Sequence, residues 1–330
     1  MTQNDAPRDS MRALRLSAFK SPPMIESVAI PAPGPGEVRV RIKACGLNFA
    51  DLLMVGGTYQ DTPEPPFTMG MEVSGLVDAH GAGVTEPAIG TPVAVFGGQG
   101  GLADYGCYDA ARLTVLPEGT DLTEAAALQV AYGTSHVALD YKAGLKPGET
   151  LLVLGAAGGV GLTAVEIGKL MGAKVIAAAR GPEKLAVAQK AGADVLIDTD
   201  KDDLRAEVKA AGGADVVYDP VGGDLFKSAM RACNPEARLI VIGFASGDIP
   251  QVPANHLLVK NLSLIGLYWG GYLAFKPEVV TESLARLVAW HGEGKIKPHV
   301  SHALPLEEAT KGMELLKNRK STGKVVITTG

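Results

Sequence analysis

The chain is poor in aromatic residues, which make up 5% of it, and it has only three cysteines. Cys45, Cys107 and Cys233 are far apart and odd in number, which argues against a disulfide framework and fits reduced thiols in a cytoplasm. No apolar run reaches about 18 residues, and residues 1–9 are polar, so neither a membrane span nor a secretory signal is predicted. The net charge of −5, without a long basic run, argues against a nucleic-acid partner.

The sequence does contain enough apolar material for about two domains, because 46% of its 330 residues are hydrophobic. Residues 11–120 consist of short strand-like segments separated by turns rich in glycine and proline, which predicts a β-rich domain, either a barrel or a sandwich. The strand candidates are Arg12–Ser17, Glu37–Ala44, Glu72–Asp78, Pro92–Phe96 and Ala103–Tyr108.

A dinucleotide-binding unit is predicted within residues 150–184. The apolar run Leu151–Leu154 has the length of a buried strand, AAGGVG follows at 156–161, and a helical pattern leads to a second strand, Val175–Ala179. Glycines in such a turn let the backbone approach a diphosphate, whose charge lies against the amides of the helix N-terminus. Ala156 stands where G-x-G-x-x-G has its first glycine, so the setting rather than the motif alone supports the prediction.

The end of the second strand indicates which dinucleotide binds. An NAD site usually has an acidic residue about 20 positions after the glycines, where it accepts from the ribose hydroxyls. Here the strand ends at Arg180, Lys184 follows one turn into the next helix, and no acid stands at the strand end. A guanidinium can bind a 2′-phosphate bidentately. This favours NADPH over NADH, with an ordinary solvated helix start as the alternative.

Strands and helices continue to alternate after this unit. Four more strands are predicted: Asp194–Ile197, Ala214–Tyr218, Arg238–Phe244 and Leu262–Leu267. With the two strands of the dinucleotide-binding unit, they make six. This alternation predicts an α/β fold with a doubly wound parallel sheet and the cofactor at the carboxyl ends of its strands. Two further helices and a last strand, Lys324–Thr328, are expected to pack back on the N-terminal β domain.

Several long motifs carry a resemblance to a known family. They are CGLNFADLL at 45–53, MGMEVSGLV at 69–77, AYGTSHVAL at 131–139, GAAGGVGLTAVEIGKLMGAKVI at 155–176 and STGKVVI at 321–327. Over essentially its whole length the chain resembles the medium-chain dehydrogenase/reductase superfamily, and most closely its zinc-independent, zeta-crystallin-like quinone oxidoreductase branch. The resemblance implies a GroES-like catalytic domain at 1–131 and 271–330, a Rossmann domain at 132–270, and a homodimer paired through the sheet edge near Leu262–Leu267.

The resemblance also argues against a metal. Zinc alcohol dehydrogenases of the superfamily have a cysteine where this chain has Asn48 and a histidine where it has Met71. An amide and a thioether are poor zinc ligands, and Glu72, which is retained, is not a site by itself. His80 and His136 have no partner at ligand spacing and are expected at the surface or hydrogen-bonded in the core. No metal is therefore predicted.

Two residues are the predicted catalytic groups. The resemblance implies that Asn48 lies beside the nicotinamide and that Tyr59 faces the substrate cleft, where it would orient the acceptor and donate a proton. Two alternatives stay open: Tyr59 as a loop residue over apolar surface, and Asn48 as a helix cap. Asp51 is expected to orient loops through hydrogen bonds.

The cofactor contacts that the resemblance implies come from several motifs. They are Asn48, Thr134, Ala157, Gly158, Gly159, Val160, Arg180, Lys184, Gly243, Phe244 and Lys324. Thr199 replaces a tyrosine that flanks the adenosine phosphate in some members, a departure that weakens the NADPH prediction. The aromatic stretch 267–272 is interpreted either as a substrate wall or as an interface.

The predicted function is metal-free, NADPH-dependent hydride transfer to a small electrophilic acceptor, a quinone or related conjugated carbonyl, in the cytoplasm. An enoyl-thioester double-bond reductase of the acryloyl- or crotonyl-CoA type would need the same geometry, and the fold cannot separate the two. A non-catalytic NADPH-binding protein is the alternative from another class.

Overall fold

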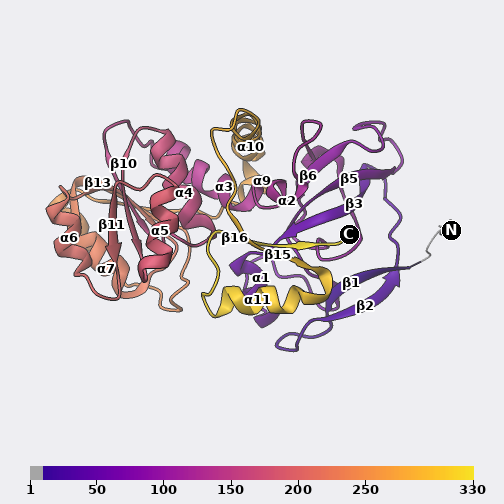
Figure 1. The fold of residues 1–330 in the computed structure, drawn as a ribbon, viewed down its shortest axis with the longest axis horizontal. Helices are drawn as coiled ribbons and strands as arrows, with labels where there is room; N and C mark the ends of the chain where they lie inside the picture. Colours follow the sequence, from indigo (N-terminus) through magenta and orange to yellow (C-terminus); the bar gives the residue numbers. More distant parts are fainter. Residues whose placement is uncertain (1–9) are drawn as a thin grey trace. The chain divides into compact units, whose positions relative to one another are not determined.

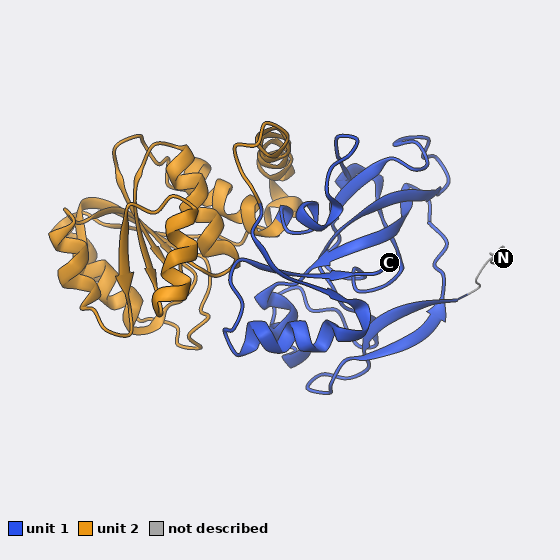
Figure 2. Cartoon of the chain, in the orientation of Figure 1, with its two compact units in different colours: residues 1–129, 298–330 blue, residues 130–297 orange. Residues whose placement is uncertain are grey.

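The computed structural model describes residues 10–330. The chain divides into two compact units, Met1–Gln129 with Pro298–Gly330, and Val130–Lys297 (Figure 2). The first boundary lies close to the predicted one. The second differs: it follows helix α10 (Pro277–Gly292) instead of preceding it. The reason is that α10 packs within the second unit, where Ser283 lies 2.9 Å from His136 Nδ1 and Trp290 meets the same ring edge-on.

The first unit is built on two β-sheets. A seven-stranded sheet has the order β15-β16-β3-β5-β6-β8, with β7 also paired to β3, and a three-stranded sheet has the order β2-β1-β4. The strands are β1 (Ser10–Leu16), β2 (Met24–Ala29), β3 (Glu37–Gly46), β4 (Phe67–Thr68), β5 (Glu72–His80), β6 (Pro92–Phe96), β7 (Tyr105–Asp109), β8 (Thr114–Val115), β15 (Val300–Pro305) and β16 (Lys324–Thr328). The predicted β-rich domain is confirmed, although β2, β4, β8 and β15 were not predicted. β2 is mostly exposed, so its apolar alternation is weak.

Strand β3 organises this unit because it pairs with both β5 and the C-terminal strand β16 (Figure 1). The registers place Gly46 opposite Glu72 on one side and opposite Val326 on the other. Two helices, α1 (Phe49–Gly56) and α11 (Ala309–Lys317), cover a core to which Met54 of α1 and Met313 of α11 contribute. A third, short helix, α2 (Leu122–Ala125), packs against β3 and β5.

The second unit is a six-stranded parallel sheet with the order β11-β10-β9-β12-β13-β14, which confirms the predicted doubly wound fold. Its strands are β9 (Thr150–Leu154), β10 (Lys174–Ala179), β11 (Val195–Asp198), β12 (Ala214–Asp219), β13 (Cys233–Val241) and β14 (Ser263–Gly266). The helices are α3 (Gln129–His136), the π-helical segment Val137–Lys142, α4 (Gly159–Leu170), α5 (Pro182–Lys190), α6 (Leu204–Ala210), α7 (Gly223–Ala232), α8 (Ala254–Lys260), α9 (Tyr272–Phe275) and α10. The strand order reverses between β9 and β12, where this fold binds nucleotides.

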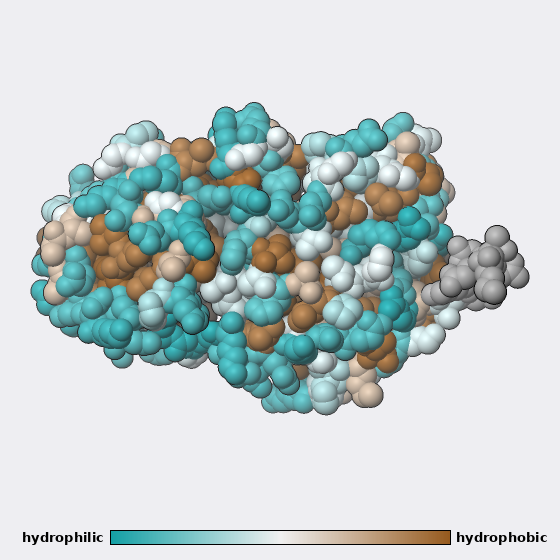
Figure 3. Space-filling view, in the orientation of Figure 1, coloured by the Kyte–Doolittle hydropathy of each residue, from teal (hydrophilic) through white to brown (hydrophobic). Residues whose placement is uncertain are grey.

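Burial follows the predicted pattern in this sheet. All five residues of the central strand β9 are buried, as expected for a strand covered on both faces. Helix α4 packs close to the end of β9, which requires glycine at position 161: a Cβ there would lie 2.2 Å from the Gly155 carbonyl oxygen. At the sheet edge, Val195 and Leu196 of β11 are only partly buried, and Figure 3 shows hydrophobic side chains over this strand surrounded by hydrophilic ones.

The described part of the chain contains no candidate for a membrane-spanning helix. No helix within residues 10–330 is both long enough and apolar enough to cross a bilayer.

Candidate functional site

The turn after β9 presents an open helix N-terminus. Gly158 is the N-cap of α4, has extended backbone angles and offers no side-chain cap. The first helical hydrogen bond runs from Leu162 N to Gly158 O at 2.8 Å. Within residues 10–330, the backbone amides of Gly159, Val160 and Gly161 have no acceptor. Uncapped amides and the positive end of a 12-residue helix dipole favour an anionic group at this place.

A buried hydroxyl network fixes this turn from behind. Ser135 Oγ of α3 donates to the Val160 carbonyl at 2.9 Å and lies 2.8 Å from Thr163 Oγ1 and 2.9 Å from the Tyr218 hydroxyl. Burial raises the pKa of Tyr218, so its hydroxyl stays protonated and can donate to Ser135. Ser135 was not among the predicted site residues, although it lies inside the motif AYGTSHVAL, next to the buried Thr134.

The end of β10 carries the predicted cations. Arg180 is exposed directly after the strand, and Lys184 lies half-buried in the first turn of α5. Between them Gly181 has φ +76° and donates its N–H to Asp198 Oδ1 at 2.9 Å. That bond lowers the pKa of Asp198, so this carboxylate stays charged. This acid was not predicted, because Asp198 reaches the end of β10 from the neighbouring strand β11.

The ends of β12 and β13 complete the same edge of the sheet. Asp219, the last residue of β12, accepts from Val221 N at 2.7 Å and Gly222 N at 2.9 Å. Gly243 and Phe244 follow β13, and their loop is tied to the one after β12 by the bond from Ala245 N to Pro220 O. The predicted contacts Ala157 to Val160, Arg180 and Gly243–Phe244 therefore come from strand ends on one edge, because all six strands are parallel.

In the first unit, a buried ion pair holds Asn48. Lys324 Nζ donates to Glu72 Oε1 at 2.7 Å, to Asn48 Oδ1 at 2.8 Å and to the Leu47 carbonyl at 2.7 Å. Asn48 Nδ2 in turn donates to Glu72 Oε1 at 2.9 Å and to the Gly46 carbonyl at 3.2 Å. The side chains of Lys324 and Glu72 are 5% and 0% exposed. All three N–H groups of Lys324 are thus engaged, which gives it a positioning role and leaves none for the predicted cofactor contact.

Asn48 is also the N-cap of α1, as one of the open alternatives proposed. Its backbone N–H donates to Asp51 Oδ2 at 2.8 Å, so Asp51 orients this loop as expected. Asp51 is fully buried, and its Oδ1 has no hydrogen-bond partner within the described residues. Burial raises the pKa of Asp51 to about 7. Asp51 is thus a carboxyl group that titrates near neutral pH next to Asn48.

Tyr59 lies beyond the other end of α1. Helix α1 ends at the left-handed Gly57, and Tyr59 follows as a half-buried residue packed against the first unit's core. The eight residues of α1, about 12 Å along the helix axis, lie between Asn48 and Tyr59, and the predicted role of Tyr59 at the acceptor stays a prediction. The packing agrees with Tyr59 covering apolar surface, the alternative left open above.

At the positions where zinc alcohol dehydrogenases have their cysteine and histidine ligands, this chain has Asn48 and Met71. Met71 is buried beside Glu72, whose carboxylate already faces the Lys324 ammonium. His80 and His136 are hydrogen-bonded as expected, to the Pro87 carbonyl at 2.7 Å and to Ser283 at 2.9 Å. Across residues 10–330 no three His, Cys, Asp or Glu side chains form a group that could hold a metal ion.

Two of the three aromatic residues in the stretch 267–272, Trp269 and Tyr272, are buried within the second unit. Trp269 is 5% exposed and packs on Gly133 of α3, where an added Cβ would lie 2.8 Å from the indole ring. Tyr272 is 7% exposed and meets the rings of Tyr141 and Phe275 at 6.0 and 4.7 Å. Both side chains therefore pack inside the second unit, Trp269 against α3 and Tyr272 against the π-helical segment and α9.

Comparison with known proteins gives consistent similarities. A family model for the alcohol dehydrogenase GroES-like domain matches residues 34–118, and one for zinc-binding dehydrogenase matches residues 159–289. Quinone oxidoreductase-like protein 2 of Bos taurus is 42% identical over 320 residues, which cover 96% of this chain and 92% of that protein.

Two solved structures are similar over nearly the whole chain. The quinone oxidoreductase of Thermus thermophilus, described together with its NADPH complex, is 35% identical, with a TM-score of 0.85 and coverage of 96% and 99% of the two chains. The Escherichia coli quinone oxidoreductase complexed with NADPH is 27% identical, with a TM-score of 0.88 and coverage of 97% and 99%.

Proposed function

Because the chain belongs to the quinone oxidoreductase branch of the medium-chain dehydrogenase/reductase superfamily, and is an oxidoreductase of that type, we propose that it uses NADPH to reduce a quinone or a related conjugated carbonyl. The reaction is hydride transfer without a metal. When bound, NADPH supplies the hydride.

The observation that carries this proposal is the uncapped N-terminus of α4 at the carboxyl edge of the sheet. Its free amides at Gly159, Val160 and Gly161 fit a diphosphate, and Ser135 keeps the turn in place through the Val160 carbonyl. Arg180 stands at the end of β10, where this fold places the adenosine ribose, and has no ion pair in the described part of the chain. An exposed guanidinium at that position suits a 2′-phosphate.

The chemistry of the first unit supports a reaction without zinc. A cation beside Glu72 is already present as the Lys324 ammonium, 2.7 Å from Oε1, and it would repel a second cation there. Asn48 and Met71 offer an amide and a thioether, which are poor zinc ligands.

We propose acceptor-binding roles for Asn48 and Tyr59. Lys324, Glu72 and the Gly46 carbonyl fix the amide of Asn48 in one orientation, since they engage its oxygen and both of its N–H groups, so Asn48 would act by position and through the second lone pair of Oδ1. Tyr59 carries a phenol, a type of group that stabilises a developing charge on an acceptor oxygen by hydrogen bonding. Thr134, Lys184, Gly243 and Phe244 remain proposed contacts of the nucleotide.

The test is NADPH oxidation at 340 nm with a panel of 1,4-benzoquinones, enones and crotonyl-CoA. The proposal predicts turnover with quinones or enones, and the same rate after dialysis against a chelator. Turnover with crotonyl-CoA alone would identify an enoyl-thioester reductase, and saturable NADPH binding without any turnover would identify a binding protein. Activity lost to the chelator would contradict the metal-free reaction.

Assembly and location are further proposals. Strand β14 forms one edge of the six-stranded sheet, and we propose a homodimer that pairs through it. The free cysteines Cys45, Cys107 and Cys233 agree with a reducing cytoplasm. Sedimentation velocity would measure the assembly, and a monomer at working concentration would contradict the dimer.

A further inference from the structure

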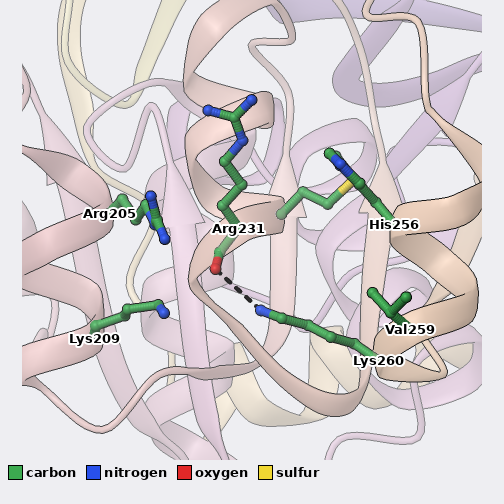
Figure 4. A pocket seen from close by; sticks show the side chains of 7 residues that line it. Arg205, Lys209, Arg231, His256, Val259 and Lys260 are labelled. Carbon is green, nitrogen blue, oxygen red and sulfur yellow. Dashed lines mark hydrogen bonds between the residues drawn. The ribbon is translucent and has the colours of Figure 1, made fainter.

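A pocket of about 330 Å³ lies between three helices of the second unit. It is lined by Arg205 and Lys209 of α6, Met230 and Arg231 of α7, and His256, Val259 and Lys260 of α8 (Figure 4). Four permanent cations and a histidine thus face one cavity, without any acidic residue in its lining, on a protein whose net charge is −5.

The pocket is separate from the proposed nucleotide site. Lys260 Nζ donates to the carbonyls of Arg231 at 3.0 Å and Cys233 at 2.8 Å. Cys233 begins β13 opposite Ala214 of β12, whereas Val241, two residues before Gly243, ends it opposite Asp219, so about 17 Å of sheet separates the two ends. Ligand binding at this pocket is therefore independent of nucleotide binding at the α4 N-terminus.

Helix dipoles explain only some of these cations. Lys209, Arg231 and Lys260 lie in the last turns of their helices, where a positive charge is favoured. Arg205 lies in the first turn of α6, where a cation is unfavourable, yet it points into the pocket (Figure 4). Arg205, Lys209 and Arg231 form no ion pair with any residue in the 10–330 range. Unpaired like charges around one cavity repel each other, and an anion would relieve that repulsion.

The arrangement indicates a ligand with more than one anionic group. Arg205 and Lys209 are four residues apart and share one face of α6, while His256 and Lys260 have the same spacing on α8. Figure 4 shows these two pairs on opposite sides of the cavity, with Arg231 between them. Arginine forks bind phosphate oxygens bidentately, and lysines add point charges. We infer that this pocket binds a small polyanion that carries two or more phosphate groups.

The experiment is isothermal titration calorimetry with inorganic triphosphate at constant ionic strength, in the presence of saturating NADP⁺. The pocket variant is Arg205→Gln with Lys209→Gln, which changes two exposed side chains. The matched control is Lys146→Gln with Lys190→Gln, which removes the same charge from exposed positions outside the pocket. We expect the dissociation constant to rise about tenfold or more in the pocket variant and less than about twofold in the control.

A second variant keeps the test independent of charge removal. Val259→Glu places a carboxylate at a 72% exposed position in the lining and should weaken triphosphate binding to a similar extent. Citrate, a carboxylate polyanion, should bind more weakly than triphosphate. Equal affinity of wild type and both pocket variants, or equal losses in the pocket variant and the control, would overturn the assignment. Citrate binding as tight as that of triphosphate would overturn its phosphate class.

Discussion

The buried Lys324 of the first unit differs from the exposed Arg180 and Arg205 of the second unit in how its charge is balanced. In the first unit, Lys324 is buried and all of its N–H groups donate to protein acceptors. In the second unit, Arg180 at the carboxyl edge of the sheet and Arg205 in the polyanion pocket have no ion pair among the described residues. A buried charge without a partner in the protein costs much free energy, whereas an exposed charge is solvated by water and stays available to bind a ligand.

This difference separates a cation that positions other side chains, Lys324, from cations that are proposed to bind anionic ligands, Arg180 and Arg205. Removing the buried Lys324 from the first unit should affect folding, because its partners would be left buried and unsatisfied. Removing the exposed Arg180 or Arg205 from the second unit should leave folding nearly unchanged and weaken an anionic ligand. Four predictions test this distinction, in order of decreasing effect.

The largest effect is expected for Lys324→Met. The change leaves the Glu72 carboxylate buried without its cation and should destabilise the first unit by about 3–5 kcal/mol. Hydrogen–deuterium exchange of amides in β3, β5 and β16 would measure the loss. The matched control is Lys311→Met, which breaks an exposed pair with Glu308 and should cost at most about 1 kcal/mol. Equal exchange rates in the two variants would show that the buried pair does not hold this unit together.

The second prediction concerns pH. The folded-state pKa of Asp51 is raised to about 7 by burial, above the unfolded value of about 3.9, so the folded state binds the proton more tightly. Stability of the first unit should therefore fall as the pH rises from about 4 to about 7, by at most about 1.4 kcal/mol per unit from this group. Asp51→Asn should remove that slope in urea unfolding, whereas Glu118→Gln, at an exposed position, should keep it. A slope unchanged by Asp51→Asn would refute the assignment.

The third prediction concerns the end of β10. Arg180→Ala combined with Lys184→Ala should raise the dissociation constant of NADPH by about 10- to 100-fold, because hydrogen bonds to charged groups contribute about 1.5–3 kcal/mol. The NADH constant should change less than about threefold, since NADH lacks the 2′-phosphate. Lys190→Ala, at the exposed end of the same helix, is the control. Equal losses for the two nucleotides would remove the argument for NADPH.

The smallest effect is expected for Ser135→Ala. It removes one of two hydroxyl donors to the Val160 carbonyl, the other being Thr163 Oγ1, and takes a buried partner from the Thr163 and Tyr218 hydroxyls. It should cost about 1–2 kcal/mol of stability and raise the NADPH constant a few-fold. Tyr218→Phe is the matched change, since it deletes a hydroxyl that contacts Ser135 and keeps the bond to Val160. Fluorescence titration would compare the two. A larger effect on nucleotide binding from Tyr218→Phe would contradict the proposed role of Ser135.

The sequence predicted those parts of the molecule that depend on neighbouring residues. The unit from β9 to β10 follows from apolar runs, glycines and helical periodicity within about 35 positions, and the six-stranded sheet follows from repeated alternation. The position of α10 could not be predicted, because its place depends on distant partners such as His136.

The charged contacts of the site were the least predictable. Lys324 and Glu72 are 252 residues apart, and only the pairing of β3 with both β5 and β16 brings them together. The sequence does not reveal that pairing, and Lys324 was therefore predicted to contact the cofactor. Asp198 was missed for a similar reason, since the strand order places β11 next to β10 and so brings an acid to Gly181.

The most direct test of the account is a titration of the protein with NADPH while the fluorescence of the reduced nicotinamide is recorded. The account predicts saturable enhancement, a weaker response in the Arg180→Ala/Lys184→Ala variant, and loss of the signal when a 1,4-benzoquinone is added. A titration without saturation, or equal affinities for NADPH and NADH in the wild-type protein, would contradict it.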